Sequence, residues 1–336
     1  MLLALESSCD ETAAAVLRPP GELLASEIAS QVAKHRPFGG VVPELASRNH
    51  LLSLRPVIET TLENAGAALG EMDAFAATSG PGLASSLLMG NTMAKSLALA
   101  HDRPFISVNH MEGHLLSPFL QTEFKPHLAL VVSGGHTLLV EVRAFGDYSQ
   151  LGSTRDDAAG EAFDKVGKML GLPYPGGPEV ELCARDGDSN RFGFPRGMID
   201  SGDLTFSFSG LKTAVLYTLR ELGEPDAQTL ADLCASFQAA VVDVLVAKAV
   251  AAAQSCGAET VALSGGVACN QALRSALADR CEREGLELLA VPPEFSTDNA
   301  AMIARAAAEK LARGRFSELS EDVDPNLSLR QLSEGG

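Results

Sequence analysis

Two segments of the chain share one layout, and this internal repeat limits the possible folds more than any other feature. Near the start, LLALESSCDETAAAVLR is an apolar run, a polar turn and a second apolar run, and LALVVSGGHTLLVEVR later repeats the arrangement. A further short run follows each of them, GELLASEIAS in the first and YSQLGSTRD in the second. Apolar runs joined by tight turns of small residues predict strands in a meander. The chain therefore contains two predicted three-stranded units.

Each predicted meander leads into a pattern of alternating helices and strands. Helices are expected over about 43–64, closed by Gly66, and over about 157–170, stopped by Gly171 and Pro173. The further expected elements are the strand DAFAATS, a helix through MAKSLALA, the strand FISVNH, a helix over about 229–253, the strand TVALS, a helix after Asn270, the strand LELLAV and a helix over 297–313. This alternation predicts an α/β fold of two lobes, each with a largely parallel sheet and with a cleft between them.

Length and composition agree with a protein of two domains inside the cell. At 336 residues the chain exceeds the usual size of one core; the predicted lobes are 1–118, completed by the C-terminal helix 297–325, and 119–296. The six cysteines have no C-x-x-C spacing, and the start MLLALESSCDET has no basic region of a signal peptide. Asp243 and Lys248 interrupt the longest apolar stretch, which predicts a buried helix. We expect a cytoplasmic protein with no membrane partner.

Four short segments place Gly and Ser between a strand and the next element: SSCDET (7–12), SGPG (79–82), SGGHT (133–137) and SGGVACN (264–270). Glycine lets backbone N–H groups approach a phosphate, and a helix N-terminus adds a favourable dipole. A single such segment is more often a turn that ends a strand. Four together favour a phosphate or nucleotide clamp, although neither the G-x-G-x-x-G nor the P-loop pattern is present.

Charged and imidazole side chains near these turns suggest a metal site. Asp10 and Glu11 suit a metal-bridged phosphate or a donor group, or they form a solvated acidic turn. His110 and His114 are an i, i+4 pair just after a predicted strand, so they share one helical face and are either metal ligands or capping and core residues. Asp298, at the start of the last predicted helix, is the best third ligand, or it is only a helix cap. Two histidines and one carboxylate suit ferrous iron or zinc.

The segment HMEGH superficially resembles the H-E-x-x-H motif of metallopeptidases, but its spacing differs. In that motif the catalytic base directly follows the first histidine, whereas Glu112 is two residues after His110. At 3.6 residues per turn, this position points Glu112 away from the metal-binding face of the helix. The sequence therefore argues against a peptidase.

Long motifs along the chain resemble one family. They are ESSCDET, VVPELASR, SGPGL, NHMEGHLLSP, VVSGGHT, DDAAGEAFDKVGKMLGLPYPGGP, FSFSGLKTAV, SFQ, SGGVACN and STDNAAMIA, which run from about residue 2 to 310. They resemble the bacterial tRNA N6-adenosine threonylcarbamoyltransferases. The resemblance implies a two-lobed actin-like ATPase fold, shared with sugar kinases and Hsp70-type chaperones, with a duplicated βββαβα unit. It also implies transfer of the threonylcarbamoyl group from threonylcarbamoyl-AMP to N6 of the adenosine 3′ of the anticodon, in tRNAs that read A-starting codons, with release of AMP.

The same resemblance implies ligands, site residues and partners. One divalent metal per chain, Fe²⁺ or alternatively Zn²⁺, would be held by His110, His114 and Asp298. The donor substrate would contact Ser133, Gly134, Gly135, His136, Thr137, Asp164, Gly177, Glu181 and Asn270. The candidate catalytic residues are Asp10, Glu11 and His136, of which Asp10 or His136 would accept the proton of the amine. The implied partners are tRNA, the TsaB paralogue, the ATPase TsaE and a TsaC-type synthase upstream.

Net charge and two alternative functions complete the sequence picture. A net charge of −17 argues against binding nucleic acid alone, so tRNA needs a local basic face or a partner. The scattered basic candidates are Lys34, His35, Arg36, Arg48, Lys165, Lys168, Arg191, Arg196 and Lys212.

A small-molecule kinase of the same fold would use the glycine turns for ATP without the metal residues. A non-catalytic scaffold should lack the metal residues that this chain retains.

Overall fold

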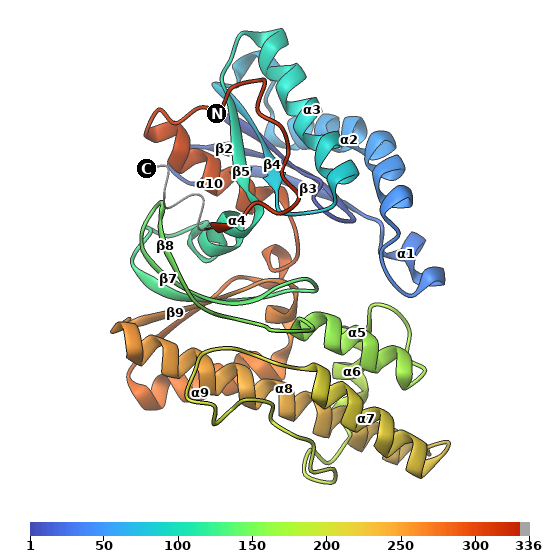
Figure 1. The fold of residues 1–336 in the computed structure, drawn as a ribbon. Coiled ribbons are helices and arrows are strands. Elements are labelled where there is room, and N and C mark those ends of the chain that lie inside the picture. Colours follow the sequence, from blue (N-terminus) through green and yellow to red (C-terminus); the bar gives the residue numbers. More distant parts are fainter. Residues whose placement is uncertain (330–336) are drawn as a thin grey trace. The chain divides into compact units, whose positions relative to one another are not determined.

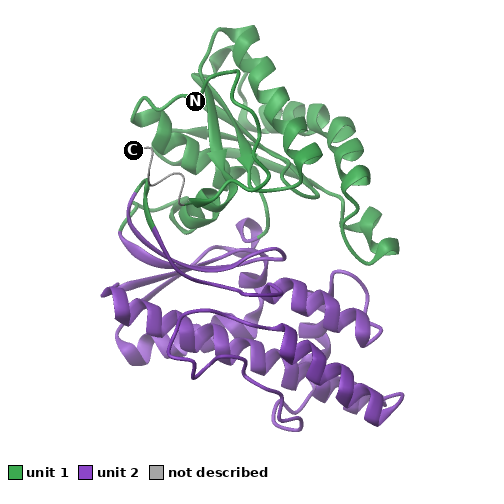
Figure 2. Ribbon diagram, in the orientation of Figure 1, with its two compact units in different colours: residues 1–125, 145–148, 297–336 green, residues 126–144, 149–296 purple. Residues whose placement is uncertain are grey.

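The computed structural model describes residues 1–329, and the chain forms two compact units (Figure 2). Unit 1 contains Met1–Lys125, Phe145–Tyr148 and the described part of Thr297–Gly336. Unit 2 contains Pro126–Ala144 and Ser149–Ser296. Each unit has its own five-stranded sheet, with helices packed against it (Figure 1).

The sheet of unit 1 has the strand order β3-β2-β1-β4-β5. Its strands are β1 (Leu2–Glu6), β2 (Glu11–Arg18), β3 (Glu22–Ser30), β4 (Ala74–Gly80) and β5 (Phe105–Asn109). The first three strands form an antiparallel meander, whereas β4 pairs in parallel with both β1 and β5. Every residue of β1 is buried, because helices cover both faces of this central strand.

Two helix layers cover the sheet of unit 1. The helices are α1 (Val32–His35), η1 (Arg36–Phe38), α2 (Pro43–Ala65), η2 (Leu69–Glu71), α3 (Ala84–His101), α4 (His110–Leu116), η3 (Ser117–Phe119) and α10 (Ala300–Ala312). Alternate strand residues such as Leu3, Leu5 and Phe75 form one core with α2 and α3. Since successive residues of a strand point to opposite faces, the intervening residues face the side on which α10 contacts β1 and β2.

The sheet of unit 2 repeats this order as β10-β9-β6-β7-β8. Its strands are β6 (His127–Val132), β7 (Thr137–Ala144), β8 (Asp147–Ser153), β9 (Thr260–Ser264) and β10 (Glu287–Ala290). Its helices are α5 (Ala159–Met169), α6 (Gly176–Ala184), α7 (Ser209–Leu222), α8 (Ala227–Cys256), η4 (Gly266–Cys269), α9 (Gln271–Glu284) and η5 (Pro293–Phe295). As in unit 1, two parallel pairings, β6 with β9 and β9 with β10, adjoin an antiparallel pair, β6 with β7.

The repeat predicted from the sequence is confirmed, with two corrections. Both sheets are mixed rather than largely parallel, because the meander of each unit contributes antiparallel strands. Helices α6 and α7 were not expected from the sequence. Helix α6 was not predicted because it starts with Gly176-Gly177-Pro178, and these residue types are typical of a turn. The boundary of α2 agrees with prediction, and Gly66 ends it at a positive φ of 60°.

Helix α8 is the one described helix long and apolar enough to cross a membrane by length and composition, but 67% of its most apolar stretch is buried within the protein. Lys248, in its middle, is only 2% exposed. The Lys248 ammonium donates to the backbone oxygen of Asp203 at 2.8 Å. Because unit 2 both buries this helix and satisfies its cation, α8 is a core helix, as the sequence predicted.

Candidate metal centre and glycine-turn site

The two predicted metal histidines come from a short helix that a capping residue starts. Asn109 ends β5, and its side-chain oxygen accepts hydrogen bonds from the backbone N–H of Met111 at 2.8 Å and of Glu112 at 3.3 Å. This N-cap fixes the beginning of α4 at His110. His114 follows one turn later, so both imidazoles project from the same side of α4.

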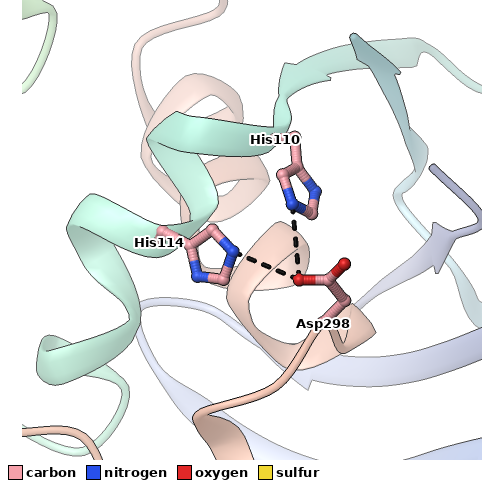
Figure 3. A group of neighbouring side chains, drawn as sticks. All are labelled: His110, His114 and Asp298. Carbon is pink, nitrogen blue, oxygen red and sulfur yellow. Dashed lines mark ion pairs between the residues drawn. The ribbon is translucent and has the colours of Figure 1, made fainter. Parts of the chain in front are cut away.

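His110, His114 and Asp298 converge in unit 1 (Figure 3). The Nε2 atoms of His110 and His114 lie 3.4 Å and 3.2 Å from the same Asp298 oxygen, Oδ1. Asp298 stands just before α10, so strand β5 and helix α10 together bring the three residues to one place. The three potential ligand atoms lie within 4.8 Å of one another. Residues separated by nearly two hundred positions thus form one compact group.

A second layer of side chains orients His110. Its Nδ1 lies 3.1 Å from Glu6 Oε2 and 3.2 Å from Ser8 Oγ. Glu6 is completely buried at the end of β1 and also accepts a hydrogen bond from the Thr78 hydroxyl at 2.5 Å. A carboxylate on Nδ1 leaves Nε2 free to face the cluster, which is the usual arrangement of a metal-binding histidine. Sequence reasoning missed Glu6, although an acid at the end of an apolar strand was a visible signal.

The electrostatics of the cluster stabilise positive charge. Burial lowers the pKa of His110, but the carboxylates of Asp298 and Glu6 outweigh burial and raise that pKa to about 10. Burial raises the pKa of Asp298, yet His110 and His114 hold it well below its ordinary value. Two carboxylates close to one buried imidazole therefore favour a cation at this position.

The residues fit a divalent metal ion. Both ring nitrogens of His114 are buried; within residues 1–329 Nδ1 has no hydrogen-bond partner, and Nε2 faces only Asp298 Oδ1, at 3.2 Å, without the geometry of a hydrogen bond. A buried imidazole nitrogen without a hydrogen bond is energetically costly. A metal ion that accepts the lone pair of this nitrogen would remove the cost. Metal–nitrogen and metal–oxygen bonds of about 2.0–2.1 Å at tetrahedral angles separate two ligands by roughly 3.3–3.4 Å. The two nitrogen-to-oxygen separations, 3.2 Å and 3.4 Å, agree with that spacing, and all three potential ligand atoms lie within 4.8 Å.

Glu112 does not belong to the cluster. Its Oε1 accepts a hydrogen bond from the Tyr148 hydroxyl at 2.9 Å, and its Oε2 lies 3.2 Å from the Lys310 ammonium. All three residues belong to unit 1. The carboxylate that would serve as the base of a peptidase is thus engaged elsewhere, as the sequence spacing predicted.

The acidic turn between β1 and β2 adjoins the metal cluster through Ser8, which contacts His110. Burial raises the pKa of Asp10, and burial raises the pKa of Glu11 to about 8. Glu11 also accepts a hydrogen bond from the Ser30 hydroxyl at 2.8 Å. These acids are therefore half-buried groups of increased proton affinity rather than a solvated turn.

In unit 2, the turn Ser133–Thr137 is closed by its own hydrogen bonds. The Ser133 N–H donates to the His136 oxygen at 2.8 Å, and the His136 N–H donates to Ser133 Oγ at 3.1 Å. Thr137 is completely buried, and its hydroxyl accepts a hydrogen bond from the Ala159 N–H at 2.9 Å. The turn therefore lies against the N-terminus of α5, where N–H groups and the helix dipole favour an anion.

Glycines both tighten this contact and leave the turn open. A Cβ at Gly160 would lie 2.6 Å from the Ser133 oxygen, so only glycine lets the turn approach α5 this closely. By contrast, a Cβ at Gly134 or Gly135 would meet no atom within 4 Å. Packing within unit 2 does not require those two glycines, and their N–H groups are accessible to a ligand.

The other predicted substrate residues of unit 2 hold the starts of nearby helices. Asp164 accepts a hydrogen bond from the Gly176 N–H at 2.7 Å, and Glu181 accepts one from the Gln271 N–H at 2.8 Å. The Asn270 side-chain oxygen caps α9. Gly177 has space around it, because a Cβ there would meet only the Phe163 side chain, at 3.9 Å. These residues therefore also have structural roles, which the sequence did not reveal.

The three candidate catalytic residues do not form one group within either unit. Asp10 and Glu11 belong to unit 1, whereas His136 belongs to the glycine turn of unit 2. The side-chain cluster and the open turn are thus contributed by different units. Each unit provides a distinct kind of site, one built of buried side chains and one of backbone N–H groups.

Solved structures define the class of fold. T. kodakarensis HypF is 15% identical, with a TM-score of 0.65 over 94% of this chain and 48% of that one. The component A of (R)-2-hydroxyglutaryl-CoA dehydratase from Acidaminococcus fermentans is 17% identical, with a TM-score of 0.55 over 93% of this chain and 98% of that one. With the duplicated sheets, these similarities define a two-lobed actin-like ATPase fold.

Sequence comparison then defines the family. The family model described as tRNA N6-adenosine threonylcarbamoyltransferase matches residues 22–305. Proteins of that name from Anaeromyxobacter sp. (strain Fw109-5) and Geobacter metallireducens are each 50% identical to this chain, over 327 and 331 residues. The alignments cover 96% and 98% of this chain, and 98% and 97% of those proteins. The chain belongs to the tRNA N6-adenosine threonylcarbamoyltransferase family and is a transferase.

Proposed function

We propose that this chain transfers the threonylcarbamoyl group from threonylcarbamoyl-AMP to N6 of the adenosine 3′ of the anticodon, in tRNAs that read A-starting codons. The observation that carries the proposal is the His110–His114–Asp298 cluster, in a chain whose family is defined by this reaction. The amine nitrogen forms a bond to the carbamoyl carbon, and the bond from that carbon to the phosphate oxygen breaks. AMP leaves as an anion, so the departing group needs no strong acid.

In this proposal His110, His114 and Asp298 hold one divalent metal ion, Fe²⁺ in preference to Zn²⁺. The metal, when bound, supplies a Lewis acid for oxygens of the donor. Glu6 holds His110 through Nδ1 at 3.1 Å, which keeps Nε2 directed at the cluster. Asn109 fixes the first turn of α4, and with it the spacing of the two imidazoles.

The glycine turn of unit 2 binds the donor in this proposal. The N–H groups around Gly134 and Gly135 hold its phosphate, with support from the N-terminus of α5. Ser133, His136 and Thr137 complete the turn, while Asp164, Gly177, Glu181 and Asn270 contact the nucleoside. Asp164 and Glu181 each accept one backbone hydrogen bond already, so the second carboxylate oxygen of each is the one that faces the ligand.

An adenine amine is a weak nucleophile, so positioning contributes most to the rate. Asp10 accepts the proton that N6 loses, because burial raises its pKa and so makes it a stronger base than an ordinary carboxylate. His136 is the alternative acceptor. Glu11, with a pKa raised to about 8, is largely protonated near neutral pH and acts as a hydrogen-bond donor to substrate.

The proposed partners follow from the family resemblance, and the surface supports one of them. A TsaC-type synthase supplies threonylcarbamoyl-AMP, and the ATPase TsaE assists turnover. The TsaB paralogue binds the helices α2 and α3, where large apolar side chains are exposed on two helices in contact with each other. These side chains are Leu51, Leu52, Leu88 and Leu99. In this proposal the reaction takes place in the cytoplasm.

The test is transfer of labelled threonine, with the synthase and partner proteins present, onto a tRNA that reads A-starting codons. The proposal predicts label on the adenosine beside the anticodon and an equal amount of released AMP. The matched control is the same tRNA with that adenosine replaced by guanosine, which should take up no label. Labelled tRNA in the control, or none with the wild-type tRNA, would contradict the proposal.

A further inference from the structure

A short basic and aromatic segment projects from unit 1 between β3 and α2. It comprises α1 and η1, which follow each other over 32–38 (Figure 1). Lys34, Arg36 and Phe38 on this segment are exposed, and Phe38 is 60% exposed. A cation–aromatic combination of this kind on the surface of a chain with net charge −17 is unexpected for a purely structural loop.

The segment is anchored by two buried residues at its base. His35 is completely buried and accepts a hydrogen bond from the Val42 N–H at 3.2 Å through Nδ1. Gln31 is 2% exposed, and its N–H donates to the Asp10 oxygen at 3.2 Å. The exposed side chains therefore extend from a fixed base rather than from a loose loop.

Arg48 of α2 adds a third positive charge beside Lys34 and Arg36 of the segment. The Lys34 ammonium donates to the Asn49 side-chain oxygen at 2.5 Å, which joins the segment to the first turns of α2. Arg48 is the neighbour of Asn49 and is exposed; within residues 1–329 it has no ion-pair or hydrogen-bond partner. Lys34 is bound by a neutral amide, so its charge is not neutralised.

Four basic candidates of unit 2 differ from Lys34 and Arg48 in their partners. Carboxylates neutralise four of them, in the pairs Lys165–Asp157, Lys212–Asp157, Arg191–Asp232 and Arg196–Asp243. Ion pairs of this kind offset the positive charge and leave less positive potential for a ligand. Lys34 and Arg48 are thus the better candidates for contacts with a polyanion.

The segment also adjoins the candidate metal centre within unit 1. Gln31 bonds to the backbone of Asp10, and Ser8 of the same turn lies 3.2 Å from His110. One four-residue turn thus contacts the metal-binding helix on one side and the base of the basic segment on the other. A substrate held by the segment would have its reacting group near that turn.

We infer that Lys34, Arg36, Phe38 and Arg48 form an RNA-binding surface for the anticodon arm of tRNA. The basic side chains contact phosphates, and a base unstacked from the anticodon loop stacks on the Phe38 ring. The inference rests on the proposed function, which requires a tRNA at this site. Exposed basic side chains on the same short segment as an exposed aromatic ring suit RNA, which offers phosphates to the cations and unstacked bases to the ring.

The experiment measures the affinity of the full-length chain, with its partner subunit bound, for fluorescent tRNA at several salt concentrations. Phe38→Ala should weaken binding by roughly fivefold to 100-fold, and Phe38→Tyr should restore it, because stacking needs only an aromatic ring. Arg36→Ala should reduce the slope of log K against log salt by about 0.7–0.9. The matched control is Arg280→Ala, an arginine of α9 that pairs with Glu284 at 2.9 Å, and it should change neither quantity.

Three results would overturn the inference. The Phe38→Ala and Arg36→Ala variants could bind tRNA with wild-type affinity, or Arg280→Ala could lose as much tRNA affinity as they do. Alternatively, Phe38→Ala or Arg36→Ala could fail to bind the partner subunit while retaining tRNA affinity. The last result would assign the segment to a protein interface. Labelled-threonine transfer by the wild-type protein is a separate measurement. Transfer in the wild type together with unchanged tRNA affinity in the variants would refute the surface and leave the proposed function intact.

Discussion

The turn between β1 and β2 and the turn between β6 and β7 have equivalent positions in two sheets of the same strand order, yet their composition is opposite. The first turn is surrounded by ionisable side chains, with Glu6 buried before it and Asp10 and Glu11 following. The second has apolar Val132 before it and Gly134 and Gly135 at its tip. A duplicated scaffold thus supports a side-chain site in one unit and a backbone site in the other.

A buried threonine performs a similar task in both units. The Thr12 hydroxyl lies 2.8 Å from His50 Nδ1 and so links β2 to α2. The Thr137 hydroxyl accepts from the Ala159 N–H and so links β7 to α5. Because the framework around the turns is the same, the chemistry of each unit depends on the few residues at the turn itself. Substitutions at the two turns should therefore affect different functions.

The largest effect is expected from the double substitution His110→Ala with His114→Ala. It removes two of three metal ligands, so bound metal should fall to background and transfer of labelled threonine should be abolished. The thermal unfolding transition should remain cooperative, since the core of unit 1 is unchanged. Metal per chain is measured by mass spectrometry; retained turnover in a metal-free variant would refute the assignment.

A smaller loss is expected from Glu6→Gln. The amide keeps the shape of the side chain but removes the charge next to His110 Nδ1, so metal affinity should fall about 10–100-fold. A chelator-competition titration gives the dissociation constant. Binding of AMP, measured with chelator present in both proteins, serves as the internal control and should stay at the wild-type value, because no residue of the glycine turn is changed.

In unit 2, paired glycine substitutions separate packing from ligand access. Gly160→Ala places a methyl group against the Ser133 oxygen, so it should lower the free energy of unfolding by about 1–3 kcal/mol. Gly135→Ala adds its methyl group in open space, so stability should be nearly unchanged while the KM for donor rises. Chemical denaturation and donor kinetics test both. Equal stability losses would show that Gly135 also serves packing.

The smallest effect concerns the pH dependence of Glu11. Burial raises its folded pKa to about 8, so the proton it holds stabilises the fold at low pH, and this contribution is lost as the pH rises through 8. Glu11→Gln should therefore be less sensitive to pH than the wild type. Between pH 5 and pH 9 we expect a relative gain for the variant of about 1–2 kcal/mol, measured by denaturation with chelator present. Parallel pH profiles would contradict the raised pKa.

The sequence predicted the parts of the fold that repeat and the parts of the site that need a special residue type. The duplicated meander, α2 and the long α8 were visible in apolar patterns. The approach of His110, His114 and Asp298 was predicted from their chemistry and positions. Glu6 and Asn109 were missed, because their importance arises from contacts between distant strands and helices. The predicted meanders correctly implied antiparallel strands, but the sequence underestimated their share of each sheet, because the alternation of strands and helices pointed to largely parallel sheets.

The most direct test of the account measures transfer by chelator-treated protein as a divalent metal is added back. The account predicts no transfer of labelled threonine in the depleted protein and full recovery at one equivalent of Fe²⁺ or Zn²⁺ per chain. The His110→Ala, His114→Ala variant should show no recovery at any metal concentration. Undiminished transfer by the wild-type chain with less than about a tenth of an equivalent of metal would contradict the assignment of this cluster as the metal centre.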